Sequence, residues 1–418
     1  MVGIANLGKL ALLHPLQHRA FRFLFAGQVV SNLGDWLDSL AVVILVVYQW
    51  RLGVGELAAL TLAWMVPGAV LGPITGVYGD RWPKRPTMIA CDVTRAALVL
   101  GLVWAPSLPV VVGLQVAKAS LSSLFGPSRQ AAVRATLPDD DLLAASALGR
   151  FSTNATKVLG PALGGLLVAA VGPRPVFALD ALSFLVSAAC LAQLPGLDAP
   201  LSSDPLPGAR FWHELRAGFS FILAAPLLRI AVLAIMAEMV IVEINDTLSV
   251  LAFRELGMNE ALVGLALGGS GLGNVLATLA IGQWGRSARP LAVMGGGMLV
   301  VGATEAVIGN ALVLGLHGSG TPWLPVLVCI GAGFAAIWVP YAYVLQRETP
   351  HALMARVSAS ADGLANVCGL VGPLLGAALA TSVGLGPVFG GTGVALAVLG
   401  ITLWLAQAGH PSTHFVPM

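Results

Sequence analysis

Charged side chains are scarce in this chain of 418 residues. Asp, Glu, Lys and Arg make up 10% of the sequence and apolar residues make up 57%, whereas soluble globular proteins carry about 25% charged residues. Folded as a sphere, the chain would lack the polar surface to cover itself. The shortage excludes an ordinary soluble enzyme, a nucleic-acid-binding domain and a disordered chain. The net charge of +2 gives no reason to expect a nucleic-acid partner either.

Cysteine and catalytic motifs are scarce too. The four cysteines, Cys91, Cys190, Cys329 and Cys368, lie far apart in apolar runs, which excludes a disulfide framework and a cysteine metal site. The sequence contains no HExxH, GxSxG or P-loop motif. We therefore expect no enzyme activity, no cofactor and no resident metal. Residues 1–18 lack a small-residue cleavage site, so no cleavable signal peptide is expected.

Long apolar runs are what the sequence has in abundance. A transmembrane helix needs about 20 apolar residues, and breaks at Gly, Pro and charge clusters separate twelve such runs. We therefore predict an all-α integral membrane protein with twelve transmembrane helices. The spans lie roughly at 21–49, 57–79, 86–105, 108–130, 142–170, 176–195, 229–252, 261–284, 290–313, 322–345, 353–382 and 387–408.

One linker divides the chain into two groups of six spans. It begins with the Pro/Ser/Asp-rich stretch PGLDAPLSSDPLPG and continues into ARFWHELRAGFSFIL, an amphipathic run predicted to lie on the membrane surface. We predict an N-terminal bundle at 1–195, a cytoplasmic linker at 196–228 and a C-terminal bundle at 229–418.

The two halves repeat each other. A shift of 212 residues places nine residues of the first half on identical residues of the second without a gap, including Gly160 on Gly372 and Gly172 on Gly384. This register predicts two parallel repeats, an arrangement common in secondary transporters.

Lysine and arginine predict the orientation. With both termini in the cytoplasm, the cytoplasmic segments hold fifteen of these residues and the opposite segments three, as the positive-inside rule requires. The expected location is the cell (inner) membrane, with a multi-pass monomer embedded in the lipid bilayer.

The loop between the second and third spans carries a family signature. Residues 76–85 read GVYGDRWPKR, which resembles the cytoplasmic loop G-x-x-x-D-R-x-x-R-[RK] of the major facilitator superfamily. Pro83 replaces a usual glycine, as is common in the drug- and macrolide-exporter branch, and DVTRAAL (92–98) and DALSFLVSA (180–188) are similar to the same branch. The resemblance implies two pseudo-symmetric six-helix bundles and the export of drug-, macrolide- or siderophore-like molecules.

This loop is a candidate cytoplasmic gate. A carboxylate at Asp80 can accept hydrogen bonds from a helix N-terminus or pair with an arginine in one conformation only. Alternatively, the loop's basic residues only fix the topology. The predicted gate residues are Gly76, Asp80, Arg81, Arg85 and Arg129, with Arg129 expected to pair with Asp80 or with the acids at 139–141.

GPALGG at 160–165 and GPLLGA at 372–377 supply small residues four positions apart, which allows helices to approach closely. In the family the motif is associated with exporters, although plain helix packing explains it as well. The predicted packing residues are Gly160, Pro161, Gly164, Gly372, Pro373 and Gly376.

Ionisable residues within the spans are candidate transport residues because they are costly in a bilayer. Asp35 and Asp38 lie three residues apart on one helical face, and Glu243 and Asp246 repeat this spacing in the second half. We predict that one acid of each pair carries a coupling proton, with Lys118 holding another acid ionised. Structural ion pairs are the alternative, and Glu238 and Glu305 are assigned a structural role.

Aromatic residues suggest a cavity for the substrate. Rings accept varied apolar ligands, and nearby acids favour cations, so we expect an amphipathic organic substrate contacted by Asn32, Trp36, Trp338 and Tyr341. Without a nucleotide site, the energy for transport must come from a gradient or from the substrate itself. The favoured hypothesis is proton-coupled efflux of drug- or siderophore-like molecules. The alternatives are a lysophospholipid or lipid transporter, and a divalent-metal exporter that uses the acids of the first and seventh spans.

Overall fold

The computed structural model describes residues 11–78, 82–196, 208–285, 288–316, 318, 320–350 and 353–408. These residues form helices and connecting turns and contain no β-strand. The elements are η2 (Ala11–Gln17), α1 (Arg19–Ile44), η3 (Leu45–Gln49), α2 (Val54–Tyr78), α3 (Lys84–Leu102), α4 (Leu108–Thr136), α5 (Asp139–Val171), α6 (Pro173–Leu191), α7 (Gly208–Ala224), α8 (Pro226–Glu255), α9 (Glu260–Trp284), α10 (Pro290–Val313), α11 (Trp323–Glu348), α12 (Met354–Val383) and α13 (Leu385–Ala408).

A long helix occupies each of the twelve predicted spans, and α7 occupies the amphipathic part of the linker. Ten helices in the described part of the chain are long and apolar enough to cross a membrane, or eleven if α7 and α8, bent by 110°, form one broken span. Among the long helices, α3 is not apolar enough to be counted, and α8 is counted only together with α7. Both carry several charged side chains, so composition rather than length sets them apart.

Glycine and proline set the helix boundaries at equivalent positions of the two repeats. Gly172, with φ of 79°, ends α5, and Gly384, with φ of 87°, ends α12. Both lie in the left-handed region that glycine adopts without a steric cost. Pro173 then begins α6, where its missing N–H costs nothing. The repeat therefore extends from the sequence to the backbone conformation.

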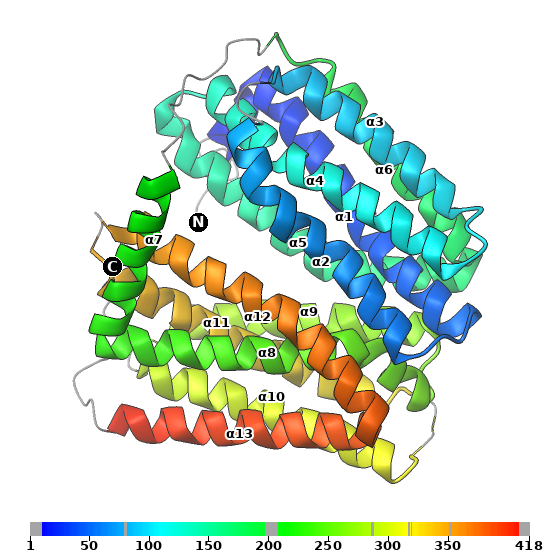
Figure 1. Ribbon diagram of the computed structural model, residues 1–418, viewed down its shortest axis with the longest axis vertical. Coiled ribbons are helices and arrows are strands. Elements are labelled where there is room, and N and C mark those ends of the chain that lie inside the picture. The colour runs from blue at the N-terminus through cyan, green and yellow to red at the C-terminus, as the bar shows by residue number, and fades with distance from the viewer. Residues whose placement is uncertain are drawn as a thin grey trace, which may run out of the picture. The chain divides into compact units, whose positions relative to one another are not determined.

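Two compact units make up the chain. Unit 1 comprises Met1–Gln49 and Leu62–Pro205, and unit 2 comprises Trp50–Thr61 and Leu206–Met418. In unit 1, α1 packs on α5 and α6, and α3 packs on α4 and α6. In unit 2, α8 packs on α12 and α13, and α10 packs on α11 and α13 (Figure 1). Helices related by the repeat thus have equivalent neighbours.

Glycines at seven-residue intervals bring α10 and α13 together. Gly295, Gly302 and Gly309 on α10 face Gly400, Gly393 and Gly386 on α13, and a Cβ atom added at Gly302 would lie 2.5 Å from the carbonyl oxygen of Gly393. Backbones approach this closely only where side chains are absent, as in many membrane-helix interfaces. The interface is therefore specified by these glycines.

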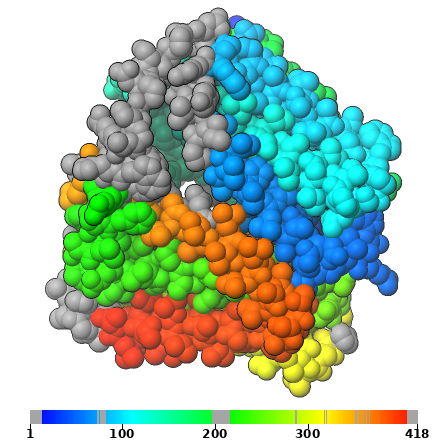
Figure 2. Space-filling model, viewed as in Figure 1, coloured from blue at the N-terminus to red at the C-terminus, as the bar shows by residue number. Residues whose placement is uncertain are grey.

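Another side of α13 carries exposed apolar side chains. Val394, Val398, Ile401 and Leu405 recur at helical spacing and are all exposed, and α13 forms part of the surface of unit 2 seen in Figure 2. An exposed apolar stripe of this kind on a long apolar helix suits contact with lipid tails.

Candidate transport site

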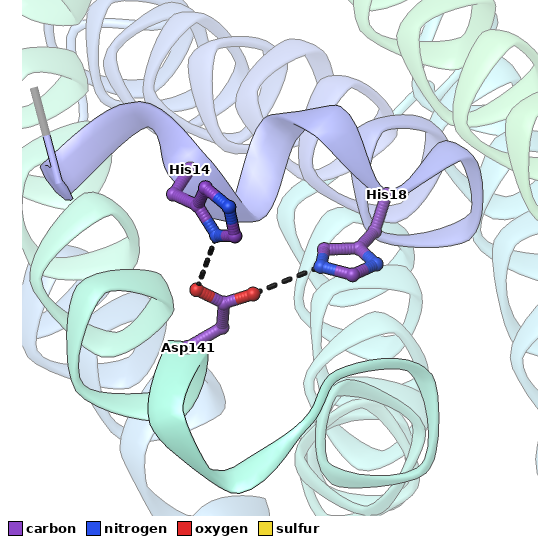
Figure 3. Close-up of side chains that lie close together, drawn as sticks. All are labelled: His14, His18 and Asp141. Carbon is purple, nitrogen blue, oxygen red and sulfur yellow. Dashed lines mark hydrogen bonds and ion pairs between the residues drawn. The ribbon is translucent and has the colours of Figure 1, made fainter. Parts of the chain in front are cut away.

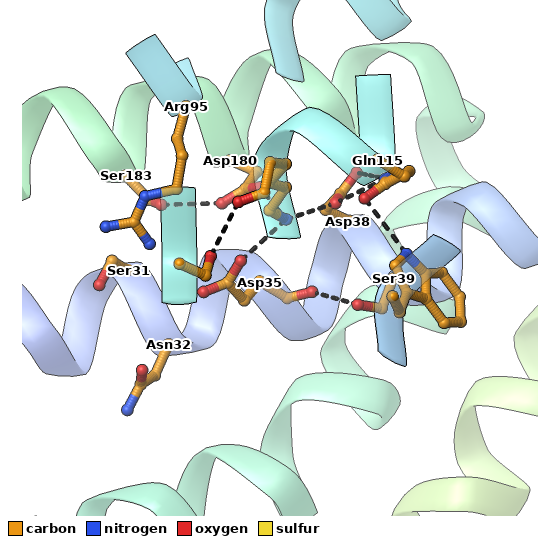
Figure 4. Close-up of polar contacts among 12 residues, drawn as sticks. Ser31, Asn32, Asp35, Asp38, Ser39, Arg95, Gln115, Asp180 and Ser183 are labelled. Atoms are coloured by element: carbon orange, nitrogen blue, oxygen red, sulfur yellow. Dashed lines mark hydrogen bonds and ion pairs between the residues drawn. The ribbon is translucent and has the colours of Figure 1, made fainter. Parts of the chain in front are cut away.

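The side chain of Lys118, on α4, lies among three carboxylates in unit 1. Its Nζ atom is 2.8 Å from Asp35 Oδ1 and 2.6 Å from Asp38 Oδ2, both on α1, and 3.5 Å from Asp180 Oδ2 on α6. We call these four residues the Lys118 cluster (Figure 4). The structure thus brings together Asp35, Asp38 and Lys118, which the sequence proposed as partners, and adds Asp180.

Neutral polar groups hold the carboxylates in place. Gln115, one turn before Lys118 on α4, donates to Asp38 Oδ2 at 3.1 Å and accepts from the indole nitrogen of Trp64 at 3.2 Å. Ser183 donates to Asp180 Oδ1 at 2.9 Å. Because buried charges need full hydrogen bonding to be tolerated in low dielectric, these contacts fix the positions of Asp38 and Asp180.

Gly34 allows α1 and α6 to meet at the cluster. A Cβ atom added there would overlap Asp180 Oδ1 and Ser183 Oγ. Since these atoms leave no room for it, any side chain at this position would displace the Asp180 carboxylate. The glycine is thus a requirement of the cluster itself.

Exposure separates Asp35 from the other two acids. Asp38 and Asp180 are 0% exposed and Lys118 is 7% exposed, while the Asp35 side chain is 37% exposed. With every group ionised, three carboxylates face one ammonium, and the cluster carries a formal charge of −2. Since unpaired charge is costly in a low-dielectric interior, the cluster can gain stability by binding a proton or another cation, and Asp35 is the member within reach of solvent.

A second ion pair lies in the same unit. Arg95 donates to Asp92 Oδ1 at 2.5 Å, both on α3, and its guanidinium lies 4.3 Å from the ring centre of Phe125 and 4.7 Å from that of Phe184. Lys118 Nζ lies 5.5 Å from the Phe184 ring. Both cations therefore lie over the Phe184 ring at cation–π distance.

The acids of unit 2 are arranged differently. Glu243 is half-buried and Asp246 is exposed, whereas Glu238 on α8 and Glu305 on α10 are 1% and 4% exposed. Neither carboxylate oxygen of Glu238 has a hydrogen bond of standard geometry, but the Trp338 indole interacts with it as a weak donor, and Glu305 and Glu243 are its charged neighbours. Glu238 and Glu305 were expected to be structural, and their burial makes them candidate transport residues as well.

Of the predicted cavity residues, two pack against each other. The rings of Trp338 and Tyr341 on α11 make an edge-to-face contact with centroids 5.7 Å apart. Trp36 packs on Gly160 of α5. Asn32 accepts from Gln28 and points away from the Lys118 cluster in Figure 4.

The predicted gate is only partly described. Asp80 and Arg81 lie outside the described residues, and Gly76 lies in the last turn of α2. Arg85 donates to the carbonyl oxygen of Ala192 at 2.6 Å. Arg129 is half-buried, and none of the described acids forms an ion pair with it; Asp141 is bound by histidines instead.

Both GP motifs pack on the first helix of their own half. A Cβ atom at Gly372 on α12 would overlap the Cβ of Glu243 on α8, and Gly164 and Gly376 make further close approaches to α1 and α8. Pro161 and Pro373 lie inside α5 and α12. Close packing of first and fifth helices is therefore common to the two units.

Comparison with known proteins identifies the family. The model of the Major Facilitator Superfamily matches residues 24–371, so this chain belongs to that superfamily, whose members are transporters. The predicted family and the all-helical membrane fold are confirmed. Ten or eleven of the twelve predicted spans are apolar enough to cross a membrane in the described residues, and the chain is a multi-pass membrane transporter.

Relatives and solved structures agree with this assignment. The chain is 29% identical over 399 residues to the uncharacterised transporter YfiS of Bacillus subtilis (strain 168), with 94% of each chain covered. It is 28% identical over 404 residues to the enterobactin exporter EntS of Shigella flexneri, covering 93% of this chain and 92% of EntS. Among solved structures, a POT family transporter in complex with a thioalcohol-conjugated peptide has a TM-score of 0.70 at 14% identity, covering 94% of this chain and 96% of that chain. A bacterial homologue of the iron transporter ferroportin has a TM-score of 0.64 at 16% identity, covering 92% of this chain and 98% of that chain. Both structures support the fold.

Proposed function

We propose that this protein is a proton-coupled exporter of small amphipathic organic molecules, located in the cell (inner) membrane with both termini in the cytoplasm. The observation that carries the proposal is the excess of acid in the Lys118 cluster, where one ammonium faces three carboxylates. The similarity to the enterobactin exporter EntS supports export as the direction.

Asp35 is the proposed exchange point for the proton. Its side chain is 37% exposed and ends 2.8 Å from Lys118 Nζ. Protonation of Asp35 would remove one of the three negative charges and weaken the attraction on the lysine, while Asp38, itself held by Gln115, would keep Lys118 in place. A cationic substrate could compensate the same charge, so proton and substrate would compete for one acidic site, as antiport requires.

The position of Lys118 argues against a divalent cation at this site. A hard cation needs several oxygen ligands around it, but the ammonium already fills the space between the Asp35 and Asp38 carboxylates. A metal ion would have to displace a lysine that is itself buried. The geometry therefore favours proton exchange over the metal-export hypothesis, and no described feature favours lipid transport.

In unit 2 we propose Glu238 and Glu305 as the acids that take part in coupling, ahead of Glu243 and Asp246. The first two are buried within the bundle, and the weak contact from the Trp338 indole replaces little of the hydration that an ionised Glu238 would have in water. A buried carboxylate of this kind responds to changes in hydration more strongly than an exposed one.

The test uses proteoliposomes that contain a pH-sensitive dye. Addition of a fluorescent lipophilic cation under an imposed pH gradient should produce proton counterflow with the wild-type protein and none with Asp35→Asn. Glu260→Gln, which removes an acid from the first turn of α9, is the control and should behave as wild type. Transport by Asp35→Asn that still depends on the pH gradient would remove Asp35 from the mechanism.

A further inference from the structure

Two histidines and an aspartate meet at one end of unit 1, outside the Lys118 cluster. His14 Nδ1 lies 2.7 Å from Asp141 Oδ1, and His18 Nε2 lies 2.8 Å from Asp141 Oδ2 (Figure 3). One potential ligand atom from each residue lies within 4.8 Å of the other two. The three side chains therefore converge on one point from two separate parts of the chain.

The local fold explains why they converge. His14 lies in the 3-10 helix η2, and His18 has an extended backbone immediately before α1. The turn between the two elements brings both imidazoles to the same carboxylate. Asp141 lies in the first turn of α5. Leu16, between the histidines, packs on a buried cluster with Phe21, Leu137, Ala145 and Leu148. This apolar contact holds η2 against the start of α5 without any metal.

The ligand set suits a borderline divalent ion. Imidazole nitrogen and carboxylate oxygen bind Zn²⁺ at about 2.0–2.2 Å in tetrahedral geometry, which separates neighbouring ligand atoms by about 3.3 Å. The two nitrogen–oxygen separations are 2.7 and 2.8 Å, each to a different oxygen of Asp141, and would need to widen by about 0.5–0.6 Å. All three ligand atoms lie within 4.8 Å of one another, so side-chain rotation can bring them around one ion. The His14 and His18 side chains are 56% and 35% exposed, so water can reach the fourth position.

Nearby charge also suits a cation. Asp139 and Asp140 share the first turn of α5 with Asp141 and add negative charge beside the site. The two ring nitrogens that lie against the carboxylate would lose any proton they carry and turn their lone pairs to the ion, because a metal binds only the deprotonated nitrogen. A metal bound here would replace two hydrogen bonds by a rigid link between η2 and α5.

We propose that His14, His18 and Asp141 bind one divalent transition-metal ion of the zinc type. The ion would fasten the segment that precedes α1 to the start of α5. His18 and Asp35 lie seventeen residues apart along α1, about 25 Å at 1.5 Å per residue. The site is therefore separate from the Lys118 cluster, and it does not depend on the proposed transport chemistry.

The test measures Zn²⁺ binding to the full-length protein, purified through a tag that contains no histidine and treated with a chelator. Titration against a chromophoric chelator should give one Zn²⁺ per chain. Substitution of Co²⁺ should produce the intense visible absorption of a four-coordinate site. His14→Gln/His18→Gln and Asp141→Asn should each weaken binding by more than about 100-fold, since they remove direct ligands.

A reciprocal variant provides the control. Replacing the other five histidines, His213, His317, His351, His410 and His414, by glutamine should leave stoichiometry, affinity and the Co²⁺ spectrum unchanged. Binding that survives in the His14→Gln/His18→Gln variant, or that disappears in the reciprocal variant, would place the metal elsewhere and overturn the proposal. Absence of Zn²⁺ binding to the wild-type protein would overturn it equally. A Zn²⁺-dependent rise in melting temperature, present in the reciprocal variant and absent in Asp141→Asn, supplies a second readout.

Discussion

Replacing Lys118 by methionine tests the charge arrangement of the Lys118 cluster most directly. The substitution keeps the length and the apolar stem of the side chain and removes its charge. At an effective dielectric constant of about 20, unit charges 2.6 Å apart, as for Asp38, attract by about 6 kcal/mol. At the 3.5 Å of Asp180 the attraction is about 5 kcal/mol. The desolvation of the ions offsets most of this energy, so the attraction is not the net stabilisation.

The cost of the substitution arises mainly from the carboxylates that it leaves behind. Removing one partner of a buried ion pair costs about 3–5 kcal/mol, and here Asp38 and Asp180 would both lose their only cation in the cluster. We expect a loss of stability near the upper end of that range at neutral pH. Acidification should restore part of it, because protonation removes the unpaired charges.

The assay is the unfolding free energy of the purified protein in mixed micelles, followed by tryptophan fluorescence at two pH values. Asp38→Asn/Lys118→Met removes one charge of each sign and should recover more than half of the stability lost by Lys118→Met. Arg150→Met removes an exposed positive charge from α5 and should change stability by less than about 0.5 kcal/mol. If Lys118→Met is as stable as wild type, or if the double variant is no more stable than the single one, the ion cluster does not control stability as argued.

Three further substitutions probe close packing and the second buried acid. Gly34→Ala should abolish transport while the protein still inserts into the membrane, because the added Cβ atom would overlap the Asp180 carboxylate. The control in the same uptake assay is Gly149→Ala, whose added Cβ atom would have no neighbouring atom within 4 Å. Gly302→Leu should lower the unfolding free energy by about 1–3 kcal/mol or more through overpacking against α13, as measured by denaturation. Glu238→Gln keeps the shape of the side chain, so the unfolding free energy should stay within about 1 kcal/mol of wild type. The pH dependence of transport should become flatter. If the pH profile of transport is unchanged, Glu238 has a purely structural role.

Much of the fold follows from periodic features of the sequence. Apolar runs separated by Gly, Pro and charge clusters predicted the positions of the twelve long helices, because each helix must satisfy its own backbone hydrogen bonds within the bilayer. The repeat of Gly172 and Gly384 predicted equivalent helix ends. The glycine pairs between α10 and α13 were missed, since seven-residue spacing on one helix does not reveal which partner helix it faces.

The site was predicted less completely for a related reason. Spacing placed Asp35 and Asp38 on one face of a helix, and a buried lysine was an obvious partner for them. Asp180 and Gln115 joined the cluster only through the packing of α1, α4 and α6, a tertiary arrangement that no local pattern encodes. The link from Asp141 to His14 and His18 also depends on tertiary packing, because more than a hundred residues separate the partners.

The two long helices that do not count as membrane spans on their own, α3 and α8, contain buried charged side chains. Helix α3 contributes the buried pair Asp92 and Arg95, and α8 contributes the buried Glu238. Each charged residue at the centre of a helix raises the free energy of membrane insertion by about 2.5–3.5 kcal/mol. Apolar residues of similar volume in place of a buried ion pair would often leave a bundle as stable or make it more stable. Since α3 and α8 pack within bundles whose other long helices are apolar enough to span alone, the bundle can carry this cost. Under the proposed function this departure from an apolar composition has a use. We propose that a change in hydration or bound charge at the buried ionisable groups of both units is converted into a change of conformation.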